Sequence, residues 1–229
     1  MYEAALETLR ERGLAYECGC SRAEIQRAAS APLGAEPVYP GTCRHRKPEV
    51  VRSIRFRAPD EPIAFDDVVC GHVEENVARQ VGDFVVKRSP SPEGPRPAQR
   101  GEGGAERRVR GVFAYQLAVV VDDAEQGVTQ VVRGGDLLAS TARQIALQRA
   151  LGLPTPQYAH LPLVVGADGL KLGKRDGAVP LATLDVSRTL AAALRILGSE
   201  ATTLREALDH FDPKRVPRNS VTARLNAAG

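Results

Sequence analysis

The stretch VTQVVRGGDLLASTARQIALQRALGLPTPQYAHLPLVV, residues 128–165, decides the fold class of this chain. It opens on an apolar run, Val128–Val132, that predicts a buried strand, and it ends on a second predicted strand, His160–Val165. Between them Thr141 is expected to cap a helix over Ala142–Leu151, which a glycine and a proline then end. Strand, helix and strand in this order form a right-handed crossover between parallel strands, so we expect an α/β fold.

Strands of another kind are predicted upstream. From Ser53 to Ala58 apolar residues alternate with arginines, and Ile63–Cys70 and Gly82–Lys87 are further strand candidates. Together they predict a small antiparallel sheet. Residues 89–111 are rich in glycine and proline and have no periodicity, so we expect a surface insertion whose arginines are solvated rather than bound to a phosphate backbone.

Composition limits the class of protein. The 229 residues include 31 basic and 28 acidic side chains, and a net charge of +3 is too small to indicate a nucleic-acid partner. No apolar run reaches the length of about 18 residues that a membrane helix needs, and the N-terminus does not have the order of a signal peptide. We therefore expect a cytoplasmic protein. Four cysteines in a chain of this length favour reduced thiols over a disulfide framework.

Three of these cysteines indicate a metal site. Cys18 and Cys20 are separated by one residue, and Cys43 follows a loop, so three thiolates can meet at little cost in loop closure. Zinc needs a fourth ligand, and the sequence leaves several candidates open: Tyr39, His45, Cys70 and His72. The alternative is that the cysteines are small buried apolar residues.

A second group of residues points to a ligand site. An apolar run from Val112 ends in the carboxylates Asp122 and Asp123, and Arg133 follows the next predicted strand. Groups at the carboxyl ends of parallel strands line the ligand crevice, where the planar fork of an arginine suits a carboxylate. Tyr115 offers a phenol for the same ligand. The alternative is a structural ion pair between Arg133 and Asp123 or Asp136.

A basic loop, Lys171-Leu172-Gly173-Lys174-Arg175, follows the last predicted strand and a turn. Cations on a loop beside a strand end can close on a nucleotide and stabilise charge on its phosphates. Taken alone, the same residues are typical of a solvated loop.

Together these stretches resemble the glutamyl-tRNA synthetase family of class I enzymes. The most specific part runs from Phe113-Ala114-Tyr115 through Val119–Asp123 to Val132-Arg133-Gly134, and includes His160–Leu163. The resemblance covers nearly the whole chain except residues 89–111. It is strongest to the short branch of the family that has no anticodon-binding domain, because two predicted helices and a tail follow the basic loop.

The resemblance implies roles for individual residues. Tyr115 and Arg133 match residues that bind glutamate, and Lys171–Arg175 matches the ATP loop, in which Lys174 is the catalytic, ATP-binding lysine. Gly173 stands where the family usually has serine, so we expect a weaker contact with ATP.

The zinc pattern of the short branch is Cys-x-Cys followed by Tyr-x-x-x-Cys. Cys18, Cys20, Tyr39 and Cys43 reproduce it, which favours Tyr39 over His45 as the fourth ligand.

The fold that the resemblance implies is the C-terminal half of a Rossmann-like catalytic fold with an inserted small α+β domain that contains zinc, and a short helical C-terminus. The expected parts are the end of the first catalytic half (1–17), the zinc-containing insertion of acceptor-stem type (18–111), the second half of the nucleotide-binding fold (112–180) and a helical segment (181–229).

The implied reaction is the activation of glutamate by ATP with Mg²⁺, followed by transfer to the queuosine base of tRNA(Asp), by a monomer. The HIGH-type motif and the glutamate-binding arginine of the family's first half have no counterpart in these 229 residues. We therefore expect that this chain alone does not activate glutamate. Two alternatives remain: a non-catalytic, zinc-stabilised tRNA-binding module, and a portion of a standard glutamyl-tRNA synthetase.

Overall fold

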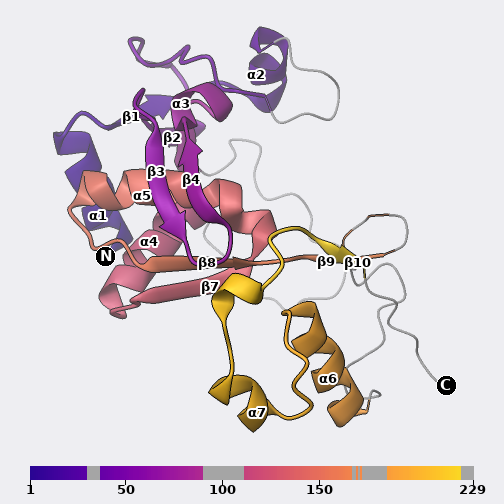
Figure 1. Ribbon diagram of the computed structural model, residues 1–229. Coiled ribbons are helices and arrows are strands. Elements are labelled where there is room, and N and C mark those ends of the chain that lie inside the picture. Colours follow the sequence, from indigo (N-terminus) through magenta and orange to yellow (C-terminus); the bar gives the residue numbers. More distant parts are fainter. Residues whose placement is uncertain (30–36, 90–110, 167–168, 170, 172–184, 223–229) are drawn as a thin grey trace, which may run out of the picture. The chain divides into compact units, whose positions relative to one another are not determined.

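The computed structural model describes residues 1–29, 37–89, 111–166, 169, 171 and 185–222 (Figure 1). The chain divides into two compact units, each built from separate segments. Unit 1 comprises residues 1–64, 74–128 and 140–155, and unit 2 comprises residues 65–73, 129–139 and 156–229. Among the described residues, no helix has both the length and the apolar character needed to cross a membrane. The four-part division expected from the sequence stays a prediction.

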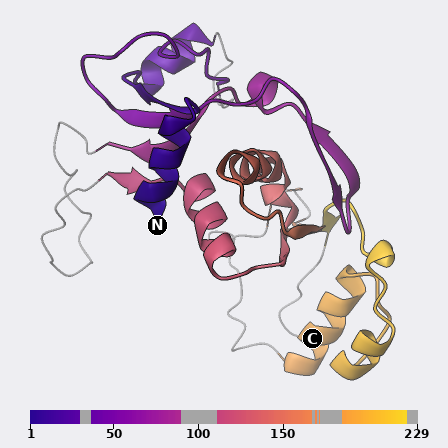
Figure 2. The same cartoon turned by 90° about the vertical axis from the view of Figure 1, so that its left-hand side faces the viewer.

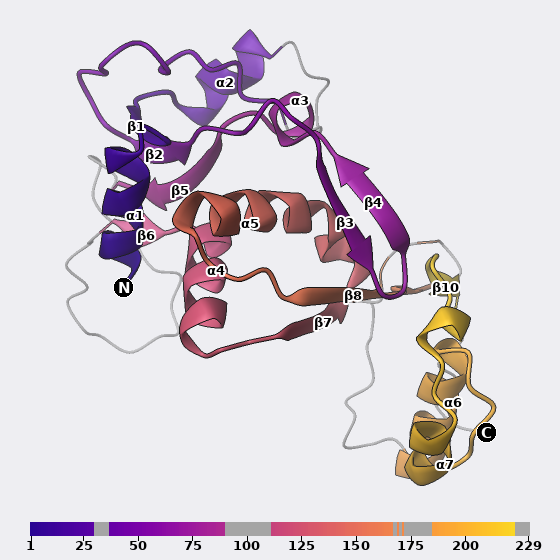
Figure 3. The same ribbon diagram turned by 60° about the vertical axis from the view of Figure 1, so that its left-hand side comes forward.

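Unit 1 contains an antiparallel sheet, which confirms two of the three strands predicted for the sheet in the middle of the chain, those at Ser53 and Gly82. Its strands lie in the order β1-β2-β5-β6 (Figure 3) and span Ala15–Cys18, Ser53–Phe56, Phe84–Arg88 and Val112–Phe113. All four residues of β2 are buried. The alternation of apolar residues and arginines therefore does not separate a buried face from an exposed one, and Arg55 lies inside unit 1.

Helices α1 (Tyr2–Glu11) and α4 (Tyr115–Glu125) also belong to unit 1. The hydroxyl of Tyr2 donates a hydrogen bond of 2.5 Å to Asp122. The apolar run that ends in two carboxylates is thus largely a helix, and Asp122 lies near its end instead of beyond a strand. Two shorter helices complete the description of this region: α2 (Arg22–Ala28), which Ser21 caps, and α3 (Val77–Gln80).

A second sheet has the strand order β4-β3-β8-β7. Its strands span Gly71–Glu75, Ile63–Asp67, Gln157–Leu161 and Gln130–Gly134, and β7 and β8 lie side by side (Figure 1). Strand β8 is parallel to β7, with His160 opposite Arg133, and parallel to β3, with Tyr158 opposite Asp67. The predicted parallel strands are confirmed. The placement of Ile63–Cys70 in the antiparallel sheet was wrong, because β3 pairs with a strand about ninety residues later in the chain.

The crossover helix α5 spans Leu138–Leu151. It begins three residues before Thr141, so the prediction that Thr141 caps it was wrong, and this side chain is fully buried within the helix. The reason is the 3-10 turn at Gly135–Leu137, which leads from β7 directly into α5. Residue 141 therefore lies inside the helix and does not have the extended backbone that an N-cap requires.

The C-terminal part of unit 2 contains the two helices that the sequence predicts. Helices α6 (Val186–Ile196) and α7 (Leu204–Asp209) lie side by side (Figure 2) and begin at the caps Asp185 and Thr203. Leu194, Ala201 and Ala207 form a small buried cluster between them. A short parallel pair, β9 (Val164–Val165) with β10 (Val221–Thr222), and a 3-10 turn at Pro213–Arg215 complete the unit.

Candidate functional site

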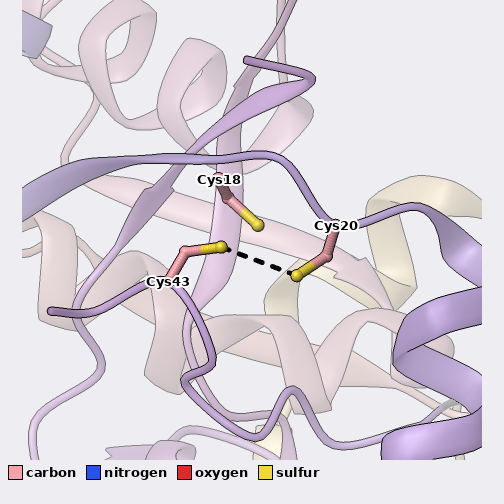
Figure 4. A group of neighbouring side chains, drawn as sticks. All are labelled: Cys18, Cys20 and Cys43. Atoms are coloured by element: carbon pink, nitrogen blue, oxygen red, sulfur yellow. Dashed lines mark hydrogen bonds between the residues drawn. The ribbon is translucent and has the colours of Figure 1, made fainter. Parts of the chain in front are cut away.

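Three cysteines of unit 1 meet at one point (Figure 4). Cys18 is the last residue of β1, Cys20 precedes α2, and Cys43 lies in a turn. Their three sulfur atoms lie within 4.8 Å of one another, and the sulfurs of Cys20 and Cys43 are 3.6 Å apart. The grouping predicted from sequence spacing is therefore present in the fold.

Tyr39 joins this thiol cluster, by which we mean Cys18, Cys20 and Cys43. Its hydroxyl oxygen lies 3.3 Å from the sulfur of Cys18 and 3.8 Å from that of Cys20, and it accepts a 3.0 Å hydrogen bond from the backbone N–H of Cys43. A β-bridge between Tyr39 and Gly82 ties the tyrosine to the start of β5.

The distances can be compared with those of a zinc site. In a tetrahedral site with Zn–S bonds of about 2.3 Å, two sulfurs are about 3.8 Å apart, and a sulfur and an oxygen ligand are about 3.5 Å apart. The 3.6 Å and 3.3 Å separations in the cluster are close to these values. The three thiols and the phenol thus fit a closed, four-ligand site, which is the structural rather than the catalytic kind.

Arg55 supports this cluster. Its Nε–H donates to the sulfur of Cys18 at 3.3 Å, and its guanidinium lies 3.8 Å from the centre of the Tyr39 ring. Burial disfavours the thiolate of Cys18, but hydrogen bonds from Tyr39 and Arg55 outweigh this effect and hold the pKa of the thiol below its usual value. Burial and the neighbouring thiol of Cys43 instead raise the pKa of Cys20 to about 11.

Asp83, the residue before β5, holds the surroundings of the cluster together. This buried carboxylate accepts two 2.6 Å hydrogen bonds from Arg44 and one from the hydroxyl of Tyr16, and its backbone oxygen accepts a bond from Arg55. Burial opposes ionisation of Asp83, but the bonds from Arg44 and Tyr16 dominate and lower its pKa.

The other candidate zinc ligands do not belong to the thiol cluster. His45 is exposed, and among the described residues no histidine or carboxylate belongs to the group formed by the three cysteines. In unit 2, Cys70 donates to the backbone oxygen of His160, and His72 contacts Asp66.

The second candidate site lies in unit 2, at Arg133 near the carboxyl end of β7. The Nε–H of Arg133 donates to Nε2 of His160 at 2.9 Å, and Nδ1 of His160 lies 2.6 Å from the carboxylate of Asp67. The guanidinium lies 5.4 Å from the centre of the Tyr158 ring. Of the two acidic partners considered as an alternative for Arg133, Asp136 pairs with Lys171.

The electrostatics of this chain of side chains favour a neutral imidazole. Burial and the positive charge of Arg133 lower the pKa of His160, against the opposing influence of Asp67. Burial disfavours the charged form of Asp67, but hydrogen bonds from the backbone N–H of Cys70 and from His160 more than compensate, so its pKa also lies below the ordinary value.

The remaining predicted site residues are only partly described. Lys171 forms a β-bridge with Val165 in unit 2, and its ion pair lowers the pKa of Asp136. The other residues of the predicted ATP loop, Leu172, Gly173, Lys174 and Arg175, lie outside the described residues. Tyr115 is the first residue of α4 in unit 1, is half exposed, and lines a cavity of about 460 Å³ that Phe113 and Arg88 also line.

Sequence reasoning missed several of these residues as parts of a site. The alternating pattern places Arg55 in a strand without marking it as part of a site, and no motif in the sequence includes Asp67 or Asp83. Arginine within an otherwise apolar strand was the available signal for Arg55. No comparable signal marked Asp67, whose side-chain partner His160 is far away along the chain.

The family of this chain follows from comparison with known proteins. The sequence model of the catalytic domain of class I tRNA synthetases (E and Q) matches residues 104–226, and the chain belongs to this family. Among curated relatives, glutamyl-Q tRNA(Asp) synthetase of Geobacter sulfurreducens is 48% identical over 94% of this chain and 68% of its own length. The enzyme of the same name from Thiobacillus denitrificans is 43% identical over 97% of this chain and 71% of its own.

Solved structures support the fold. A glutamate-tRNA synthetase from Elizabethkingia anophelis superimposes with a TM-score of 0.70 at 21% identity, over 98% of this chain. The chain spans about half the length of that protein, 50%, so the similarity concerns one part of a larger enzyme.

Proposed function

We propose that this chain contributes to the activity for which its curated relatives are named: activation of glutamate with ATP and Mg²⁺, and transfer of the glutamate to the queuosine base of tRNA(Asp). The observation that carries the proposal is the 48% identity to a glutamyl-Q tRNA(Asp) synthetase over 94% of the chain. We further propose that the protein acts as a monomer in the cytoplasm, where tRNA and ATP are found.

In this proposal Arg133 binds a carboxylate of glutamate. It lies at the carboxyl end of a parallel strand, which is where ligands bind in open α/β sheets, and a guanidinium is suited to a carboxylate. Tyr115 orients the same substrate. Lys174 and its neighbours in the loop 171–175 stabilise negative charge on the reacting phosphates.

We assign Cys18, Cys20, Tyr39 and Cys43 to a zinc site. A bound Zn²⁺ would supply a rigid crosslink between the end of β1 and the turn that contains Cys43. The hydrogen bond from Arg55 to Cys18 offsets part of the negative charge that several thiolates bring to the ion.

Glutamate binding is the first test. Isothermal titration of the chain with L-glutamate should give a binding signal that Arg133→Lys strongly weakens, because lysine cannot present a planar fork. Binding that is unaffected by this substitution would contradict the assignment of Arg133.

The acceptor is tested separately. Supplying labelled glutamyl adenylate bypasses the activation step, for which the sequence predicts that further residues are needed. Label is expected on tRNA(Asp) that carries queuosine, with tRNA(Asp) lacking queuosine and tRNA(Glu) as matched controls. Label on the 3′ end of tRNA(Glu) would instead indicate a standard glutamyl-tRNA synthetase. Binding of tRNA(Asp) without transfer would favour the non-catalytic module.

A further inference from the structure

A chain of three side chains runs through unit 2 from Asp67 through His160 to Arg133. The side chains of Asp67 and His160 are completely buried, and the contacts from carboxylate to imidazole and from imidazole to guanidinium are 2.6 Å and 2.9 Å. The three residues come from three neighbouring strands, β3, β8 and β7. Their sheet therefore sets the distances between them.

The donors and acceptors among Asp67, His160 and Arg133 assign one tautomer to His160. An arginine is always protonated in proteins, so the Nε–H of Arg133 is a donor and Nε2 of His160 must accept. The proton of a neutral imidazole then lies on Nδ1 and is donated to Asp67. Protonation of Nε2 would place two N–H groups against each other.

Asp67 is itself immobilised, so the series of hydrogen bonds that ends at Arg133 starts from a fixed side chain. One of its carboxylate oxygens accepts hydrogen bonds from the backbone N–H groups of Val69, Cys70 and His160, at 3.0, 2.8 and 3.2 Å. The other carboxylate oxygen faces Nδ1 of His160.

We propose that Asp67 and His160 are positioning residues that hold the Arg133 guanidinium in the orientation in which it binds a substrate carboxylate. The proposal rests on the proposed function of Arg133. Because Nε–H is directed at His160, a carboxylate must be bound through the terminal nitrogens of the guanidinium, one of which also donates to the backbone oxygen of Leu137 at 3.4 Å. An arginine that is oriented before substrate arrives loses less side-chain freedom on binding.

The imidazole has a second effect, which concerns charge. A carboxylate in direct contact with Arg133 would compete with the substrate for the guanidinium. The neutral imidazole between them provides a hydrogen-bond acceptor for Arg133 and keeps the negative charge of Asp67 one side chain further away. Arg133 thus stays anchored and retains its attraction for an anion.

Two substitutions of His160 separate positioning from simple packing. In His160→Gln the amide oxygen can reach the place of Nε2 and still accept from Arg133, whereas in His160→Asn the shorter amide can serve only Asp67. We expect glutamate to bind His160→Gln within about threefold of the unaltered chain. His160→Asn should weaken binding about tenfold, which is the cost of ordering one long side chain. Thermal unfolding of both variants shows that each is folded.

Asp67→Asn supplies a spectroscopic test that needs no substrate. The amide oxygen can keep the three backbone hydrogen bonds, so the amide NH₂ faces Nδ1 of His160 and forces the imidazole proton onto Nε2, against Arg133. Nitrogen-15 NMR should show a proton on Nδ1 in the unaltered chain and on Nε2 in the variant, with faster exchange of the Arg133 Nε–H.

The outcomes distinguish the positioning role of Asp67 and His160 from the proposed function of Arg133. If Arg133→Lys abolishes glutamate binding but His160→Asn and Asp67→Asn bind as the unaltered chain does, the positioning role is overturned and the proposed function stands. If the unaltered chain does not bind glutamate, the proposed function fails. If Arg133→Lys binds glutamate equally well, the assignment of Arg133 fails, and the positioning role of Asp67 and His160 fails with it. A proton on Nε2 of the unaltered chain overturns the hydrogen-bonded arrangement itself.

Discussion

Replacing Gly82 by alanine should damage the thiol cluster although residue 82 does not contact a sulfur. Gly82 has φ of +73°, and an added Cβ would lie 2.4 Å from the backbone oxygen of Tyr39 and 2.9 Å from its backbone nitrogen. Ordinary contacts begin at 3.4 Å, so the two segments must separate by about 1 Å. Because both colliding groups are backbone, no side-chain rotation relieves the clash.

Gly127→Ala is the matched control. Gly127 follows α4 in the same unit, has φ of +66°, and an added Cβ would meet nothing within 4 Å. Alanine at positive φ costs roughly 1 to 2 kcal/mol, and the stiffer unfolded chain offsets about 0.5 kcal/mol of this cost. We expect Gly127→Ala to lower the free energy of unfolding by about 1 kcal/mol and Gly82→Ala by about 3 kcal/mol, the difference being the overpacking cost against Tyr39.

Urea unfolding measures both values, and competition with a chromogenic chelator measures zinc affinity. Gly82→Ala should release zinc at least tenfold more readily, because movement of Tyr39 carries its hydroxyl away from Cys18 and Cys20. Gly127→Ala should bind zinc as the unaltered chain does. Equal stabilities for the two variants, within about 0.5 kcal/mol, would refute the steric argument.

Three further predictions concern the two candidate sites. Tyr39→Phe keeps the ring beneath Arg55 but removes the hydroxyl, and zinc affinity measured by chelator competition should fall at least tenfold; unchanged affinity would exclude Tyr39 as a ligand. Asp83→Asn removes the charge that pairs with Arg44 and should cost about 2 to 3 kcal/mol in urea unfolding, below the value for a fully buried pair because Arg44 is partly exposed; a loss under 1 kcal/mol would argue against the pair as a main support. The folded state lowers the pKa of His160 below 6.5, so the unfolded chain binds the extra proton first and the free energy of unfolding should fall as pH drops below about 6.5. In His160→Gln this fall should be shallower between about pH 7 and 5.5. Identical slopes for the two proteins would contradict the assignment of this pH dependence to His160.

Local patterns predicted many of the elements of the fold. The helices α6 and α7, which the sequence predicts after the basic loop, depend on residues close together in the chain. The errors occurred where a distant segment decided the outcome. The sequence predicts that β3 continues the antiparallel sheet, yet β3 pairs with β8, because parallel pairing depends on a crossover that lies far along the sequence.

The candidate sites show the same division. Spacing alone indicated the thiol cluster, since Cys18 and Cys20 are separated by one residue and Cys43 follows in the same part of the chain. Spacing left the fourth ligand open, and similarity to a family was needed to prefer Tyr39. The fold brings the Tyr39 hydroxyl to the sulfurs through a bridge to Gly82, a contact between segments about forty residues apart.

By itself, the sequence determined the class of fold, the family and the residue types at both candidate sites, because these depend on periodicity and on motifs of neighbouring residues. Tertiary structure alone decided which side chains support the sites. Arg55 contacts Cys18, and Asp67 orients His160 beneath Arg133, because strands distant in the chain lie next to each other in a sheet. Hydrogen bonds require distances near 3 Å, and only the packing of those strands creates such distances.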